Sequence, residues 1–171
     1  RAPPDARGPP DSGANTIAVL TISSTAAATT APLPAPSSPA GAGGAITLDA
    51  TQSVKTTTGS VISANGNNGP GGAVNVRASN IQVQGVVSAN GTIGGVVRLV
   101  APDDHGVISI QSAQVQTNGS SGRGGTVAIS GKQQTAISGS TISATGMTQG
   151  GRILIGNDAP GGTLPFSATT T

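Results

Sequence analysis

The chain of 171 residues carries eight Lys and Arg against six Asp, a formal net charge of +2, with hydrophobic residues at 35% and charged residues at 8%. This length suits one domain, and no apolar run reaches the roughly 18 residues that a membrane-spanning helix needs. The cations are scattered and Phe166 is the one Phe, Tyr or Trp, so a nucleic-acid partner is not expected. Without Glu or helical periodicity, the sequence favours an all-β fold.

Residues 1–42 form a leader rich in Pro, Ala, Gly and Ser, a composition typical of extended chain that packs poorly. Within the leader, the apolar run at 16–23 predicts a single strand. The repeats that follow are expected to span 43–162, and 163–171 is interpreted as a tail or the start of a further repeat. The unfinished last repeat suggests a fragment of a longer protein.

A Gly-Gly pair begins each repeat. The first glycines of the pairs stand at 43, 71, 94, 124 and 150, at intervals of 23 to 30 residues. Self-similarity at such a period indicates a solenoid, in which a single unit cannot bury its apolar face and must stack on its neighbours. The sequence therefore predicts four complete turns and a partial one.

After each pair comes a short run whose second and fourth residues are aliphatic. Successive side chains of a strand point to opposite faces, so these residues share one face. We expect this face to form the core of the coil. The residues are Ile46, Leu48, Val74, Val76, Val97, Leu99, Val127, Ile129, Ile153 and Ile155.

A second strand ends each turn, at 61–66, 86–91, 114–119 and 141–146, and three of the four finish on Asn-Gly. Asn-Gly indicates a turn because both residues tolerate positive φ. If the three asparagines occupy equivalent corners, their side-chain amides are expected to form a hydrogen-bonded ladder. The predicted corner residues are Asn65, Gly66, Asn90, Gly91, Asn118, Gly119 and Gly146.

A less regular apolar segment lies between these two columns, near 54–58, 81–83, 108–110 and 135–137. This segment completes about three short strands per turn. Consecutive turns of such a coil pair in parallel about 4.8 Å apart. Insertions can loop out at a corner without disturbing the stack, as we expect for 102–106.

The repeats resemble those of filamentous haemagglutinin-type adhesins, large exoproteins of bacterial two-partner secretion. The resemblance covers 43 to about 165 and rests on the Gly-Gly opener, the ISATG strand end at 142–146 and the GGRILIG segment at 150–156. It implies a right-handed parallel β-helix, secretion to the bacterial cell surface through an outer-membrane pore, and roles in attachment, aggregation or biofilm. The implied partners are host-cell or environmental glycans and neighbouring cells.

The function implied in this way is non-enzymatic, with no cofactor. A fragment of a carbohydrate-active enzyme is the alternative, because parallel β-helices include polysaccharide lyases and hydrolases. Such enzymes need clustered carboxylates, often with Ca²⁺, or an acid/base pair, whereas Asp103-Asp104-His105 is best interpreted as a solvated corner loop. Gly156-Asn157-Asp158 faintly resembles a Ca²⁺-binding repeat, but such sites need tandem copies. We predict no catalytic or metal-binding residue.

Two of the Asn-Gly corners also match the pattern of N-glycosylation acceptors, with Thr92 after Asn90-Gly91 and Ser120 after Asn118-Gly119. The need for Asn-Gly at a bend accounts for the same match. The open ends of the coil would further allow end-to-end self-association, because a solenoid end presents an unpaired sheet edge.

Overall fold

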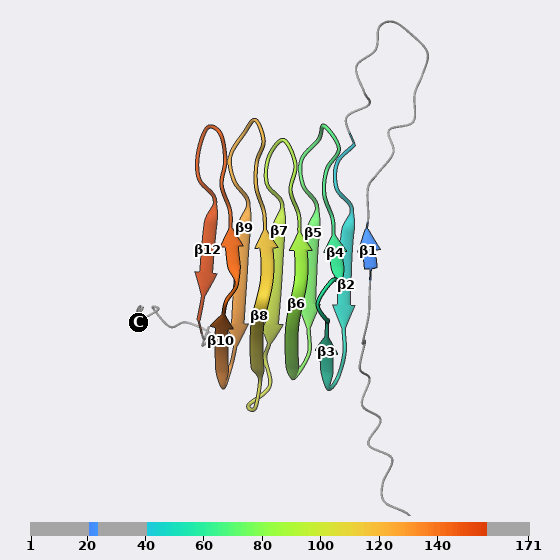
Figure 1. Cartoon of the computed structure of the whole chain (residues 1–171), viewed down its shortest axis with the longest axis vertical. Helices are drawn as coiled ribbons and strands as arrows, with labels where there is room; N and C mark the ends of the chain where they lie inside the picture. The colour runs from blue at the N-terminus through green and yellow to red at the C-terminus, as the bar shows by residue number, and fades with distance from the viewer. Residues whose placement is uncertain (1–20, 24–40, 157–171) are drawn as a thin grey trace, which may run out of the picture.

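The computed structural model describes residues 21–23 and 41–156. In these residues the chain forms twelve strands and no helix, and parallel sheets stack into a β-solenoid of about four turns. Figure 1 shows successive turns lying side by side, from β1 at one end of the stack to β12 at the other. The predicted all-β repeat architecture is confirmed.

The first strand of every turn belongs to a five-stranded parallel sheet in the order β12-β9-β7-β5-β2. Its register aligns the predicted core column residue by residue, so that Ile46 lies opposite Val74, and Val74 opposite Val97. The strands are β2 (Ala45–Asp49), β5 (Ala73–Arg77), β7 (Val96–Ala101), β9 (Thr126–Gly131) and β12 (Arg152–Ile155).

The middle and last segments of each turn share a second, seven-stranded sheet with the path β1-β4-β6-β8-β10, in which β3 pairs with β6 and β11 with β8. The two segments run as one continuous strand in β6 and β8 and are separate strands in the turns on either side. The strands are β1 (Thr21–Ser23), β3 (Ser53–Lys55), β4 (Val61–Ser63), β6 (Asn80–Ser88), β8 (Val107–Gln116), β10 (Gln134–Ser138) and β11 (Thr141–Ser143).

The predicted leader strand at 16–23 falls partly on β1, which pairs in parallel with β4. Residues 16–20 lie outside the described part of the chain, as do 1–15, 24–40 and 157–171. The proposed tail at 163–171 and the last residues of the predicted repeat region therefore also lie outside it.

A kink separates the middle and last segments within the second sheet. Each turn has one residue with positive φ at this point: Gly59, Gly85, Ser112 and Gly139. The register between β6 and β8 shifts there, between Val83 and Gly85. A left-handed residue turns the strand sharply, and glycine adopts this conformation without a steric penalty. The bend thus lies inside one sheet, and the pairing resumes on both sides of it.

The core lies between the two sheets and is built from aliphatic and small side chains. The column from the first sheet meets Ile62, Ile81, Ile108 and Val115 from the second. Of the ten predicted core residues, Ile46, Val74, Val76, Val97, Leu99, Val127 and Ile129 are buried, and Leu48 is partly buried against the cluster.

Ile153 and Ile155 are the exceptions, and their prediction as core residues is wrong for the described structure, because they are 41% and 40% exposed. Both belong to β12, which ends the first sheet. In the described part of the chain, the second sheet ends one turn earlier, at β10 and β11, so no strand faces β12 in its own layer. Their apolar surface is therefore left uncovered.

Candidate functional site

The Gly-Gly pairs at 71–72, 94–95 and 124–125 lie where backbones of neighbouring segments approach too closely for any side chain. A Cβ atom on Gly71 would lie 2.2 Å from the carbonyl oxygen of Ala89, and one on Gly72 would lie 1.9 Å from that of Gly44. Such distances are far inside van der Waals contact. The pairs at 94–95 and 124–125 meet the same obstacles. The stacking of the turns therefore requires glycine in these three pairs, whereas Gly150 in the last pair has nothing within 4 Å of its Cβ position.

The second glycine of each pair also closes a corner by hydrogen bonding. From the pair at 71–72 onward, its N–H donates to the carbonyl oxygen of the residue that follows the preceding strand, as from Gly72 to Ala64 at 2.8 Å and from Gly95 to Ala89 at 2.7 Å. In a parallel ladder this carbonyl would normally accept from the next turn. The backbone N–H group of the next turn that would donate to this carbonyl, such as that of Asn90 above Ala64, must therefore find another acceptor.

The predicted asparagine ladder supplies this acceptor. The Asn90 N–H donates to Oδ1 of Asn65 at 2.7 Å, and the Asn118 N–H donates to Oδ1 of Asn90 at 2.7 Å. The ladder continues into the last turn, where the Thr145 N–H donates to Oδ1 of Asn118 at 2.9 Å. The rungs thus join a side-chain oxygen to a backbone N–H of the next turn, in agreement with the predicted ladder of asparagine side chains along the stack.

Positive φ does not explain the glycines of the predicted corners, so that part of the prediction is wrong. Among the described residues, positive φ occurs at the four kinks and at Asn68 and Gly156, and at none of the predicted Asn-Gly or Thr-Gly corners. Glycine is needed there because a Cβ on Gly91 would lie 2.2 Å from the backbone nitrogen of Gly71. Gly66, Gly119 and Gly146 are equally confined. Close approach, and not left-handed backbone, selects glycine.

Asn90 and Asn118, the two glycosylation candidates, are half-buried members of this ladder. The Asn90 side-chain nitrogen, to which a glycan would be attached, donates to Oε1 of Gln116 at 3.3 Å. Glycosylation of either residue would have to preserve or replace these contacts, and it stays a prediction.

A polar hollow of about 320 Å³ opens on the outer face of the second sheet, beside the kink. It is lined by Lys55, Gln82, Val83, Gln84, Ser109 and Gln111, from β3, β6 and β8. Gln84 accepts from Thr58 at 3.3 Å, while no hydrogen bond within the described residues engages the side chains of Gln82 and Gln111. The hollow therefore presents carboxamides that are available to a ligand.

No sequence motif marks these residues. The kink shifts the register of the middle segments between neighbouring strands, so equivalent positions do not align in the sequence. A usable signal was present, since Gln82 and Gln84, like Ser109 and Gln111, occupy alternate positions of a strand and hence one face.

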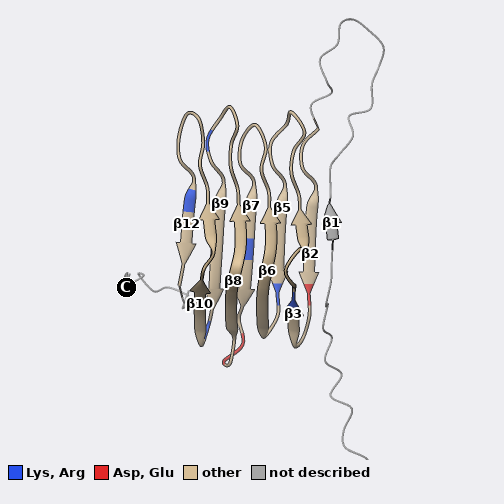
Figure 2. Cartoon of the chain, viewed as in Figure 1, with Lys and Arg blue, Asp and Glu red and all other residues tan. Residues whose placement is uncertain are grey.

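A second, wider hollow of about 510 Å³ lies along the Gly-Gly corners of the last turns. Glycine backbone forms much of its wall, and the polar side chains are those of Arg123, Thr126, Gln149 and Arg152. This hollow lies where the strands of the first sheet begin. The described acidic residues lie where those strands end, in β2 and in the loop after β7, as the red segments of Figure 2 show. We call this hollow the cationic groove.

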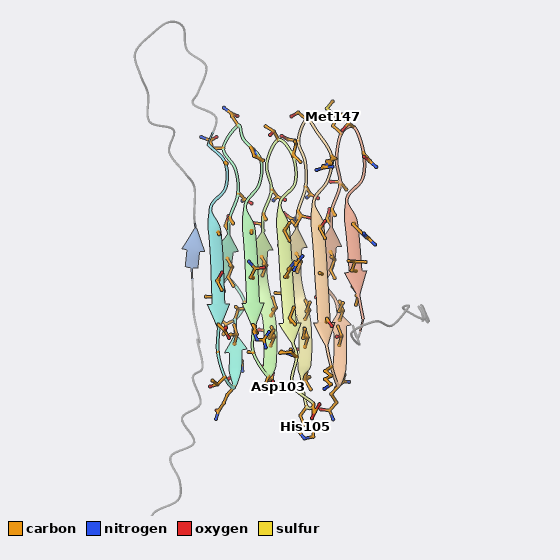
Figure 3. The ribbon with its side chains drawn as sticks, turned by 180° about the vertical axis from the view of Figure 1, so that it is seen from behind. Asp103, His105 and Met147 are labelled. Atoms are coloured by element: carbon orange, nitrogen blue, oxygen red, sulfur yellow. The ribbon has the colours of Figure 1, made fainter. Side chains whose placement is uncertain are left out.

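The Asp103-Asp104-His105 loop is exposed, as predicted from its sequence. Figure 3 shows Asp103 and His105 at one end of the strands and Met147 at the opposite end. Asp103 accepts a hydrogen bond from Ser79, and Asp104 forms an ion pair with Lys132. Lys132 lowers the pKa of the Asp104 carboxyl group, first through its own hydrogen bond to that carboxylate and second through its positive charge.

This loop does not join a larger ionisable cluster. Within 41–156 and β1, no group of three or more His, Cys, Asp and Glu residues is placed to hold a metal ion. Neither hollow has a carboxylate in its lining. Asn157 and Asp158 of the Ca²⁺-like segment lie outside the described residues.

Fold and surface together define a parallel β-solenoid of stacked repeats. Comparison of the chain with known protein families, with curated proteins and with solved structures found no match. A search of the described residues for helices able to span a membrane found none.

Proposed function

We propose that the chain is a structural and adhesive segment of a large secreted bacterial surface protein, which holds binding surfaces away from the cell. In this proposal the protein is exported through an outer-membrane pore and promotes attachment, aggregation or biofilm. The solenoid acts as the shaft. Its outer faces make weak, repeated contacts with glycans or neighbouring cells.

The observation that supports the shaft most strongly is the unbroken bonding along the stack. Strand pairing joins each turn to the next in both sheets, the core is continuous, and the asparagine ladder adds side-chain bonds at one corner. A solenoid held by such nearest-neighbour contacts resists bending, because bending would open several ladders at once. This architecture suits a stiff spacer.

The polar hollow supports the adhesive part of the proposal. Carboxamides donate and accept hydrogen bonds at the same time, as the hydroxyl groups of a sugar require. The hollow, at about 320 Å³, falls at the lower end of the size range of small-molecule sites, roughly 300–1,000 Å³. A monosaccharide unit of a longer glycan is therefore a suitable occupant.

A glycan array probed with the folded chain tests adhesion. We expect selective binding to neutral, hydroxyl-rich glycans, with millimolar to micromolar affinity for single units and stronger binding to clustered ones. The triple variant Lys55→Ala, Gln82→Ala, Gln111→Ala should lose this binding. The matched triple variant Thr47→Ala, Asn75→Ala, Thr126→Ala, on the outer face of the first sheet, should retain it. Equal binding by both variants, or none by the unaltered chain, would contradict the proposed adhesive site.

A polysaccharide-degrading enzyme would have the same fold class, since a β-solenoid is compatible with either function. No observation on the described surface favours it, so adhesion is the function we propose. Incubation of the chain with soluble plant and bacterial polysaccharides distinguishes the two. New reducing ends or unsaturated sugar products would overturn the non-enzymatic proposal.

A further inference from the structure

Four Asn-Gly dipeptides occur in the chain, at Asn65-Gly66, Asn68-Gly69, Asn90-Gly91 and Asn118-Gly119. This dipeptide can deamidate without an enzyme. The backbone nitrogen of glycine attacks Cγ of the asparagine, a C–N bond forms, and ammonia leaves as the succinimide ring closes. Water then opens the ring and yields aspartate or isoaspartate. The reaction needs a side chain that can fold back on its own chain.

Three of the four asparagines are held away from this geometry by the ladder. Oδ1 of Asn65 accepts from the N–H of Asn90, and the Gly66 N–H donates to the Asn90 carbonyl oxygen at 2.7 Å. The corners at Asn90 and Asn118 have the same pair of bonds. Both the electrophilic carboxamide and the attacking nitrogen are thus bound to the next turn. Reaction would require the corner to open.

Asn68 differs from these three in its side chain, although its backbone also pairs with the neighbouring segment at Gly41. It is exposed, stands in the first corner loop with φ of 57°, and is no part of the ladder. Its carboxamide makes no hydrogen bond to any other described residue. Within the described residues, no hydrogen bond therefore holds the side chain away from the Gly69 nitrogen.

We infer that Asn68 is a spontaneous deamidation site and that the ladder protects the other three Asn-Gly dipeptides. The product replaces a neutral amide with a carboxylate, and isoaspartate also adds a carbon atom to the backbone. This change falls beside the point where the Gly41 N–H donates to the Asn67 carbonyl oxygen at 2.7 Å. Ageing of the protein would thus mark the first corner loop and leave the shaft intact.

Peptide mapping by mass spectrometry tests this inference on the folded full-length chain, incubated at mildly alkaline pH and sampled over time. We expect deamidation at Asn68 to be at least about tenfold faster than at Asn90 or Asn118, a factor that corresponds to about 1.4 kcal/mol of protection. In concentrated urea the four rates should converge, because the ladder is lost. On ion-exchange chromatography, a more acidic form of the protein should accumulate at the same rate as deamidation at Asn68.

Asn68→Gly is the control, since glycine keeps the positive φ and removes the amide. It should abolish the early charge variant and leave thermal unfolding unchanged. Equal rates at Asn68 and Asn90 in the folded chain would overturn the inference. So would a rate difference that persists unchanged in urea, because the contrast would then come from local sequence and not from the ladder.

Discussion

Ile129 and Ile155 are neighbours in register on β9 and β12, yet Ile129 is 1% exposed and Ile155 is 40% exposed. The same contrast separates Gly124, whose space for a side chain is filled, from Gly150, which has nothing within 4 Å of its Cβ position. Each pair has the same residue type at the same place in the repeat. In a solenoid, therefore, the environment of a residue depends on the turn above it as much as on its own strand.

The largest expected effect comes from the two isoleucines. Ile129→Ala should destabilise the protein by about 2–5 kcal/mol, as is typical of truncating a fully buried aliphatic side chain. Ile155→Ala should cost less than about 1 kcal/mol, because much of that side chain already contacts water. Urea unfolding of both variants measures the difference. Equal losses would mean that a further turn covers β12.

The glycine pair sharpens the same comparison at the corner. Gly124→Ala would place a methyl group 2.1 Å from the Ala144 carbonyl oxygen and should cost about 1–3 kcal/mol or more through backbone displacement. Gly150→Ala should be neutral or slightly stabilising, because alanine restricts the unfolded chain. Thermal unfolding of the two variants separates them. A tolerated Gly124→Ala would argue against the close approach of the turns.

The ladder offers a third comparison between inner and last turns. Asn90→Leu removes the acceptor of the Asn118 N–H and should cost about 1–3 kcal/mol, the usual penalty for a buried donor without a partner. Thr145→Val, in the last complete turn, removes one hydroxyl contact to Asn118. Its loss of unfolding free energy should be only a few tenths of that expected for Asn90→Leu. Chemical denaturation compares both with the unaltered chain. If Asn90→Leu unfolds like the parent, the ladder contributes nothing to stability.

The kink gives the smallest effect, and at Ser112 the expected change is stabilising. Ser112 has φ of 50° where the other three turns use glycine, and a non-glycine residue in this region costs about 1–2 kcal/mol. Ser112→Gly should therefore raise the free energy of unfolding by up to about 1 kcal/mol after the added entropy of glycine is subtracted. Gly139→Ser should show the reverse change, since its side chain has room. The same sign for both variants would contradict this account of the kink.

Much of the fold could be predicted because its signals are local. Gly-Gly pairs and alternating aliphatic residues report close approach and one-sided burial, and both repeat in every turn. The kink could not be predicted in the same way, because Gly59, Gly85, Ser112 and Gly139 share no motif. The polar hollow beside it was missed for the same reason.

The asparagine ladder could be predicted in part. The alignment of Asn65, Asn90 and Asn118 predicted its members, since equivalent positions of a repeat must stack. Its chemistry could not be inferred from one strand. The Asn oxygen becomes an acceptor only because Gly72 and Gly95 occupy the carbonyl groups of Ala64 and Ala89, a contact that exists only after the turns have closed.

Amide hydrogen exchange of the folded chain, followed residue by residue by NMR, tests the stacked ladder most directly. The N–H groups of Asn90 and Asn118 lie in corner loops, yet each donates to a side-chain oxygen of the preceding turn. We predict that both exchange as slowly as the strand amides of β6 and β8, and that the Asn65→Ala variant accelerates Asn90 selectively. Exchange of these two amides at the rate of an exposed loop would contradict the account.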